Sequence, residues 1–178
     1  MSWIELKHSK RSVRRAGDFL INPHENFDLD KFLESYNVLE NWRSSHAYPI
    51  QSMLGYFRKK AFEADKDSIV ARRLKRTPSI LAKLRREKGM KLDRMEDIGG
   101  CRIVVSNISQ VYEVKNSIVD GSTRNTLRRL RNYIKEPKES GYRGIHIVYR
   151  YNGEKNNTHP TQLNSKLEVR ISIFGQQR

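Results

Sequence analysis

The chain has 178 residues, enough for one domain with a real core and too few for two comfortable ones. Its 35 lysines and arginines against 20 acidic residues give a net charge of +15, which attracts nucleotides, nucleic acids or an anionic membrane face. No apolar run approaches the roughly 18 residues of a membrane span, and the single cysteine, Cys101, excludes an internal disulfide. We therefore expect a cytoplasmic protein with a phosphate-bearing ligand and no membrane partner.

Helices are predicted for the first part of the chain. Residues 1–26 are expected to form a loosely ordered basic N-terminal arm, followed by a single domain over residues 27–178. Apolar residues at helical spacing predict an amphipathic helix over residues 28–43, and Pro49 can begin a second helix over residues 49–64. In a third helix, Thr77 is the expected N-cap, Pro78 the first helical residue and Gly89 the stop.

Strands are predicted for the later part. The stretch "CRIVV" predicts a strand over residues 101–105, and a further helix is expected over residues 108–121. A weaker strand follows over residues 126–134, with clearer strands over residues 143–151 and 166–174. Helices early and strands late predict an α+β fold, with a mixed or antiparallel sheet flanked by helices.

The third helix is a candidate phosphate site. Ser79, Lys83 and Arg86 are spaced to share one helical face, and Arg73 and Lys75 lie just before the helix, whose positive end favours an anion. Residues 71–102 carry eleven lysines or arginines against four acids, which suits a triphosphate or is only an ordinary basic helix face. The chain has no G-x-x-x-x-G-K-[ST] motif, so a P-loop is excluded.

Two acids are candidate metal ligands. Asp97 stands at the entrance to the strand 101–105. In the last strand, alternation places Glu168, Arg170 and Ser172 on a polar face, and His146 lies opposite the apolar face of the preceding strand. If these two strands are neighbours, their polar faces line one cleft, where Asp97 and Glu168 could bind Mg²⁺ beside a phosphate. Taken alone, each acid is more often a surface residue.

The turn before the strand 143–151 is a candidate nucleotide site. Lys138 offers a cation to a phosphate, and Gly141 lets the turn approach a ligand closely. The ring of Tyr142 could stack on a base, which is worth roughly 1–3 kcal/mol, and His146 could donate a hydrogen bond to the same ligand. The alternative for Tyr142 is partial burial against the sheet.

Four segments, "RLKRTPSILAKLRR", "DIGGCRIVV", "YIKEPKESGYRGIHIVYRY" and "LEV", resemble in order and spacing the RelA/SpoT-type nucleotide pyrophosphokinases, or alarmone synthetase domains. The match covers roughly residues 40–170, and "NWRSSHAYP" is similar to the small single-domain members, including toxins. The resemblance implies a nucleotidyltransferase-like synthetase fold and a Mg²⁺-dependent transfer of pyrophosphate from ATP to a ribose 3′-hydroxyl. The resemblance implies three possible acceptors. The first is GDP or GTP, which would give (p)ppGpp; the second is an adenine nucleotide. The third is the 3′ end of tRNA, as in the toxin branch, where an antitoxin is a further partner.

The resemblance also implies residue roles. Asp97 and Glu168 are the implied catalytic residues and Mg²⁺ ligands. The residues implied to bind ATP are Arg73, Lys75, Ser79, Lys83, Arg86 and Arg102, with the adenine between the first and last of these arginines. The residues implied to bind the acceptor are Lys138, Tyr142, His146 and Arg170.

The sequence departs from the family pattern at two places. Arg170 stands where the family usually has Gln, and Ser172-Ile173 replace an Arg followed by Thr or Ser. The family also continues into a helix rich in Trp, Ala and His, whereas this chain stops at Arg178, which indicates a truncated or diverged C-terminus. The alternative function is therefore a catalytically impaired nucleotide- or RNA-binding module on the same scaffold.

Overall fold

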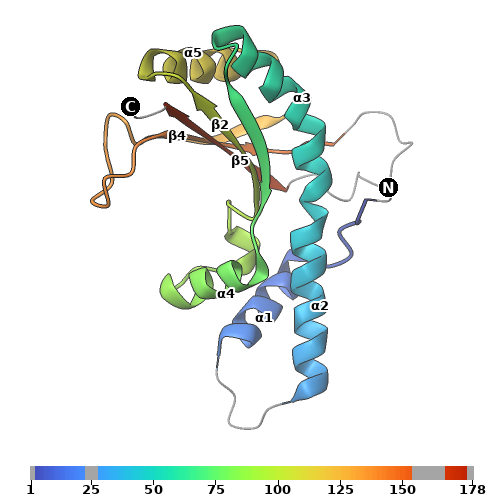
Figure 1. Cartoon of the computed structure of the whole chain (residues 1–178). Coiled ribbons are helices and arrows are strands. Elements are labelled where there is room, and N and C mark those ends of the chain that lie inside the picture. Colours follow the sequence, from blue (N-terminus) through green and yellow to red (C-terminus); the bar gives the residue numbers. More distant parts are fainter. Residues whose placement is uncertain (1–2, 23–27, 154–166, 176–178) are drawn as a thin grey trace.

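The computed structural model describes residues 3–22, 28–153 and 167–175. In chain order, its elements are α1 (Lys10–Ile21), α2 (Leu29–Ser45), α3 (Ala47–Ala64), β1 (Ile69–Leu74), α4 (Thr77–Arg86), the 3-10 helix η1 (Leu92–Arg94), β2 (Gly99–Val105), α5 (Ile108–Val119), β3 (Thr126–Asn132), β4 (Ile145–Arg150) and β5 (Glu168–Gly175). They form an α+β fold with a five-stranded mixed sheet, as the sequence predicted (Figure 1).

The sheet has the strand order β1-β2-β5-β4-β3. Neighbouring strands are antiparallel except for β2 and β5, which are parallel and begin at the same end of the sheet. Gly100 of β2 lies opposite Arg170 of β5, and His146 of β4 lies opposite Ser172. The two central strands therefore carry their starting residues, and Asp97 just before β2, to a common edge.

One face of the sheet is closed by α3 and α5 (Figure 1). The apolar positions of β4 and β5, including Ile145, Ile147, Ile171 and Ile173, pack with α3 side chains such as Phe57 into the larger hydrophobic cluster. Strand alternation sends the intervening residues to the opposite face, which α3 and α5 leave open. The predicted polar face of the sheet is thus the face on which a ligand can approach.

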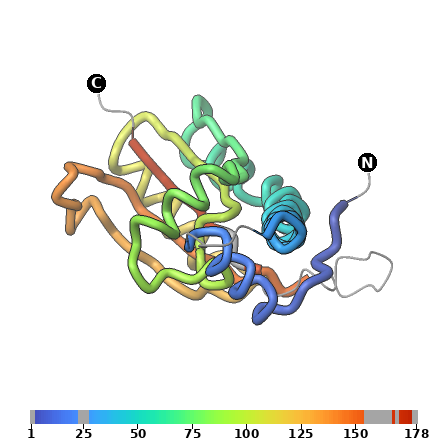
Figure 2. Tube along the Cα trace, turned by 90° about the horizontal axis from the view of Figure 1, so that it is seen from below, coloured from blue at the N-terminus to red at the C-terminus, as the bar shows by residue number. Residues whose placement is uncertain are grey.

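A second hydrophobic cluster joins α1, α2, α4 and η1. Helices α2 and α3 follow one another almost as one rod, which Figure 2 shows nearly end-on beside the strands. The junction is His46, whose Nδ1 lies 2.7 Å from the Trp42 carbonyl oxygen. Burial lowers the pKa of His46 to about 4, so the imidazole at this junction is neutral at neutral pH.

Most predicted elements are confirmed, with shifts at their ends. The second helix begins at Ala47 rather than Pro49. The N-cap of α4 is Arg76 rather than Thr77, because the Thr77 hydroxyl donates instead to the carboxylate of Glu40 on α2. Within the described residues, no helix has the length and apolar character needed to cross a membrane.

The expected loose conformation of residues 1–26 is wrong for Lys10–Ile21, which form α1. Ser9 caps this helix by accepting a hydrogen bond of 3.2 Å from the Ser12 backbone, and Val13, Ala16 and Leu20 are buried in the second cluster. Strand β1 was not predicted either. It is an edge strand that is largely exposed on both faces, so it lacks the alternation by which strands are recognised.

The packing of α1 against η1 can be tested with a glycine at the contact and a control glycine on the exposed side of α3. A Cβ on Gly17 of α1 would come within 2.7 Å of the Leu92 Cβ, whereas a Cβ on the exposed Gly55 of α3 would meet nothing within 4 Å. We expect Gly17→Ala to lower the free energy of unfolding by about 1–3 kcal/mol through overpacking. Gly55→Ala should raise it by about 0.5–1 kcal/mol through helix propensity. Urea unfolding of the two variants measures both, and equal effects would contradict the packing of α1 against η1.

Candidate active site

A cavity of about 220 Å³ opens on the uncovered face of the sheet. Its lining residues come from the end of β1, the start of β2 and the segment before it, the turn before β4, the start of β4, and β5; they are Arg73, Asp97, Gly99, Gly100, Cys101, Arg102, Lys138, Tyr142, His146, Arg170 and Ser172. Within the described part of the chain, Asp97 is the one acidic residue of this lining, against four lysines and arginines. The cavity therefore favours a polyanion.

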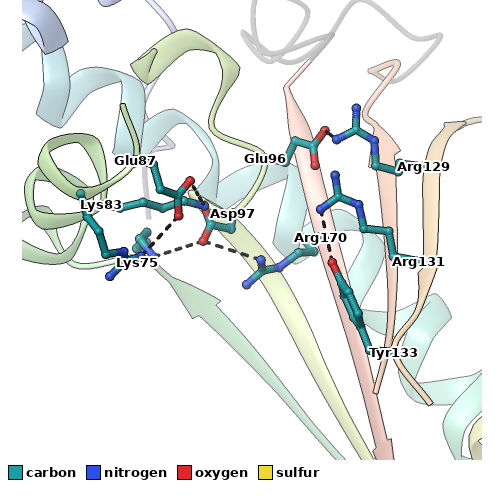
Figure 3. Close-up of polar contacts among 10 residues, drawn as sticks. Lys75, Lys83, Glu87, Glu96, Asp97, Arg129, Arg131, Tyr133 and Arg170 are labelled. Carbon is teal, nitrogen blue, oxygen red and sulfur yellow. Dashed lines mark hydrogen bonds and ion pairs between the residues drawn. The ribbon is translucent and has the colours of Figure 1, made fainter. Parts of the chain in front are cut away.

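The Asp97 carboxylate is the centre of an ion cluster, defined here as Asp97, Lys75, Lys83 and Arg170 (Figure 3). Lys83 Nζ lies 2.9 Å from one carboxylate oxygen, and Lys75 Nζ lies 3.1 Å from the other. Arg170 Nη1 approaches the second oxygen to 3.6 Å from β5. Only 8% of the Asp97 side chain is exposed, so a nearly buried negative charge is shared by three cations.

Helix α2 fixes the segment that carries both lysines. Arg43 donates a 2.8 Å hydrogen bond to the Lys75 carbonyl oxygen, and Thr77 donates to Glu40. Ile80 and Leu84 then anchor α4 in the second hydrophobic cluster. Residues three and four positions apart on a helix are neighbours, so this anchoring fixes the direction of Lys83 toward Asp97.

The pKa of Asp97 reflects competing effects. Burial of the carboxyl acts to raise its pKa, but the hydrogen bond and charge of Lys83, with the charges of Arg170 and Lys75, outweigh it and hold the pKa at about 2. Because this value lies below the ordinary 3.8, ionised Asp97 stabilises the folded state above about pH 4, and this contribution is lost as the pH falls toward 2. The carboxylate is fully charged at neutral pH.

The other end of the cavity is aromatic. The turn before β4 closes with a 2.8 Å hydrogen bond from the Gly141 N–H to the Lys138 carbonyl oxygen, and Gly141 has a φ of +74°, as its predicted role in the turn requires. Tyr142 Oη lies 2.5 Å from His146 Nε2, and the ammonium of Lys138 stands 5.5 Å from the Tyr142 ring centre. Tyr142 is half-buried and also lines the cavity. It is thus partly buried against the sheet, as one alternative predicted, and still placed where its ring could contact a ligand, as the other predicted.

His146 is a neutral base in this environment. Its burial lowers its pKa, and the positive charges of Arg170, Lys138 and Arg131 lower it further, to about 4, although Asp97 acts in the opposite direction. A neutral ring has one N–H and one bare nitrogen, so it can both donate and accept.

The structure brings most predicted site residues together. Seven of them line the cavity: Arg73, Asp97, Arg102, Lys138, Tyr142, His146 and Arg170. Lys75 and Lys83 are outside the lining but donate hydrogen bonds to Asp97, which lines the cavity. Ser79 and Arg86 are exposed on α4, outside the lining. The Glu168 backbone lies at the start of β5, opposite Arg150, and the predicted role of its side chain lies outside the described part of the structure.

Two aromatic residues of this region were not predicted. Tyr133 packs edge-on against Tyr142, with ring centres 5.8 Å apart, and against His146 at 5.1 Å. Phe174 packs edge-on against Tyr142 at 5.6 Å. Alternation along β5 places Phe174 on the same face as Arg170 and Ser172, so the sequence pattern could have predicted which face of the sheet it occupies.

Comparison with known proteins identifies the family. The profile described as "Region found in RelA / SpoT proteins" matches residues 72–177. The chain belongs to the RelA/SpoT family. Its relatives include the GTP pyrophosphokinase YwaC of Bacillus subtilis, 35% identical over 82 residues, which cover 43% of this chain and 38% of YwaC. The GTP pyrophosphokinase YjbM of the same organism is 36% identical over 84 residues, which cover 46% of this chain and 39% of YjbM. The matches thus span about two fifths of these relatives.

Solved structures agree with this RelA/SpoT assignment. The small alarmone synthetase 1 from Bacillus subtilis, bound to its product pppGpp, superposes with a TM-score of 0.61 and 26% identity, covering 76% of this chain and 71% of that chain. The small alarmone synthetase 2 from the same organism gives a TM-score of 0.57 at 23% identity, covering 79% and 71%. The five-stranded mixed sheet with its helices is therefore the fold of these synthetases.

The low pKa of His146 can be tested by titration. We expect its ring to titrate near pH 4 in the folded protein, measured by ¹H–¹⁵N NMR with His146→Gln to assign the signal. Because the unfolded state takes up the proton first, stability should fall between about pH 6.5 and 4 and fall less in His146→Gln. Arg170→Gln should raise the pKa of His146, because after burial the positive charge of Arg170 lowers it most, whereas Arg128→Gln on exposed β3 should not. A wild-type midpoint near 6.5 would contradict the described environment.

Proposed function

We propose that this RelA/SpoT chain is a pyrophosphokinase that transfers pyrophosphate from ATP to the ribose 3′-hydroxyl of a nucleotide acceptor. The observation that carries the proposal is the position of the Asp97 ion cluster, which joins a cationic end of the cavity to an aromatic end. In the reaction, the 3′-oxygen bonds to the β-phosphorus of ATP, the bond from that phosphorus to the α-phosphate oxygen breaks, and AMP leaves. Such transfer depends mainly on positioning and on neutralising charge.

The cationic end suits ATP. Lys75 and Lys83 are held beside the cavity by Asp97, and a triphosphate offers them alternative oxygens of higher charge. Arg73 and Arg102 line the same cavity from neighbouring strands, where their planar guanidinium groups can stack on the adenine. Ser79 and Arg86, on the same helix as Lys83, are assigned to the outer phosphate contacts by the family resemblance.

The aromatic end suits the acceptor. The Tyr142 ring offers a stacking surface for a base, Lys138 supplies a cation beside it, and neutral His146 fixes the Tyr142 hydroxyl. Arg170 lies between the two ends, within 3.6 Å of Asp97 and in the same lining as His146. We assign to Glu168, at the start of the neighbouring parallel strand, the activation of the attacking hydroxyl.

Asp97 and Glu168 are the candidate ligands for a Mg²⁺ ion in this site. Asp97 is ionised at neutral pH, and Glu168 is the first residue of β5, the strand beside β2. We therefore propose that Asp97 and Glu168 hold Mg²⁺ together with ATP phosphate oxygens, where the ion would neutralise phosphate charge. Within the described residues, no group of three potential metal ligands among His, Cys, Asp and Glu is present. Mg²⁺ is usually held by one or two carboxylates together with phosphate oxygens and water, and we assign it Asp97 and Glu168 alone from the protein.

The favoured acceptor is a guanine nucleotide, GDP or GTP, so that the product is an alarmone of the (p)ppGpp type. The support is that the matched curated relatives are named GTP pyrophosphokinases or a probable GTP diphosphokinase. The second candidate acceptor is the 3′ end of tRNA, as in a toxin with an antitoxin partner. The net charge of +15 and the exposed arginines of β3 beside the cavity favour this larger anion.

Transfer is tested with ATP labelled at the β-phosphate, Mg²⁺, and GDP, GTP, an adenine nucleotide or tRNA in turn. We expect labelled acceptor and an equal amount of AMP, and a loss of at least about 100-fold in Asp97→Asn, which removes a charged group from the reacting site. Lys135→Gln, an exposed cation outside the cavity, is the matched control. Nucleotide or RNA binding with no transfer to any acceptor would instead support the impaired module that the Arg170 departure suggests.

The two ends of the cavity predict separable defects. Lys83→Ala should raise the KM for ATP by about 10-fold or more while the KM for the acceptor changes little, because Lys83 belongs to the cationic end. Tyr142→Ala should do the reverse, since it removes the stacking surface. Steady-state kinetics with each substrate varied separately measures both. Similar changes in both constants for both variants would refute the assignment of two ends.

A further inference from the structure

Phe174 contacts one lining residue from each end of the cavity. The Arg102 guanidinium carbon lies 5.3 Å from the centre of the Phe174 ring, in cation–π contact. The Tyr142 ring meets Phe174 edge-on, with an angle of 85° between the ring planes. One aromatic ring therefore contacts both an arginine assigned to ATP and the tyrosine assigned to the acceptor.

The Phe174 ring has a fixed place on the sheet. It is on β5, between Arg102 on β2 and the turn that carries Tyr142 ahead of β4. Gly144 leaves the space that the ring occupies, because a Cβ at Gly144 would come within 3.0 Å of two Phe174 ring carbons. The ring therefore packs against the Gly144 backbone, and the side chains of Arg102 and Tyr142 both contact it there.

We propose that Phe174 is a shared positioning residue that couples binding at the ATP end to binding at the acceptor end. This inference rests on the proposed function for the identity of the two ligands. A nucleotide that orders Arg102 also orders the Phe174 ring, and the ring in turn orders Tyr142. The second nucleotide then loses less conformational entropy on binding, which is positive cooperativity.

Tyr133 provides a matched control for this role. It also contacts the Tyr142 ring, and Lys138 lies 4.7 Å from its ring centre, so it supports the acceptor end from the other side. Within the described part of the chain, the Tyr133 ring contacts Tyr142, His146 and Lys138, and neither Arg102 nor Phe174. A change at Tyr133 should therefore affect acceptor binding without affecting the ATP end.

The test is calorimetric titration of two probes, the ATP analogue AMPCPP and the acceptor GDP. Each probe is titrated alone and again with the other present. A CCA-ended oligoribonucleotide replaces GDP as the acceptor probe if it binds better. We expect the acceptor probe to tighten AMPCPP binding by about five-fold in the wild type. Phe174→Leu should weaken both probes by roughly three- to ten-fold and reduce the tightening below about two-fold. Phe174→Tyr, which keeps the ring, should retain both affinities, and Tyr133→Leu should weaken only the acceptor probe.

Several outcomes would overturn the inference: unchanged affinities in Phe174→Leu, weakening of only one probe, or a Phe174→Tyr variant as defective as Phe174→Leu. Thermal unfolding checks that each variant folds, and Phe174→Met replaces Phe174→Leu if the latter does not. Cooperative wild-type binding without pyrophosphate transfer would refute the proposed function and leave this inference standing. Transfer that is normal in Phe174→Leu with unchanged cooperativity would refute the inference alone.

Discussion

The buried carboxylate of Asp97 is the constraint on which the rest of the site depends. A nearly buried charge is costly unless it is paired, and removal of one partner of such a pair is strongly destabilising. Here the pairing cations come from the segment after β1, from α4 and from β5, so the charge can be satisfied only when these three elements meet. The ion cluster thus fixes the cationic side chains relative to the central strands before any ligand binds.

The two hydrophobic clusters position different parts of the site. The larger one closes one face of the sheet with α3 and α5, so the polar positions of β4 and β5 lie on the other face, where the cavity opens. The smaller one holds α1, α2, α4 and η1 together and thereby aims Lys83 at Asp97. Asp97 lies in the chain between Met95 and Ile98, both buried in the smaller cluster, and two residues before β2, whose apolar side chains pack in the larger cluster. The site therefore lies where the two packing units join.

The sequence predicted the elements with clear periodicity and the residues with distinctive chemistry. The alternation in β4 and β5 placed His146 and Arg170 on one face, and the motif spacing placed Asp97 beside them. Edge strand β1 was missed because both of its faces are largely exposed, and α1 because its narrow buried stripe lies within a strongly basic stretch. The contacts of Phe174 could not be predicted because they depend on strand order, which places β5 between β2 and β4. Similarly, helical spacing groups Ser79 with Lys83, but only the docking of α4 decides which of them reaches Asp97.

The central claim is that Asp97 holds two lysines for ATP phosphates and then serves as a ligand for Mg²⁺. The most direct test is the affinity for AMPCPP with and without Mg²⁺, in the wild type and in Asp97→Asn. Since the carboxylate competes for the lysines in the absence of metal, Asp97→Asn should bind AMPCPP at least as tightly as the wild type without Mg²⁺. Added Mg²⁺ should then tighten binding by about ten-fold in the wild type and by less than about two-fold in Asp97→Asn. An equal effect of Mg²⁺ on both proteins would contradict the account.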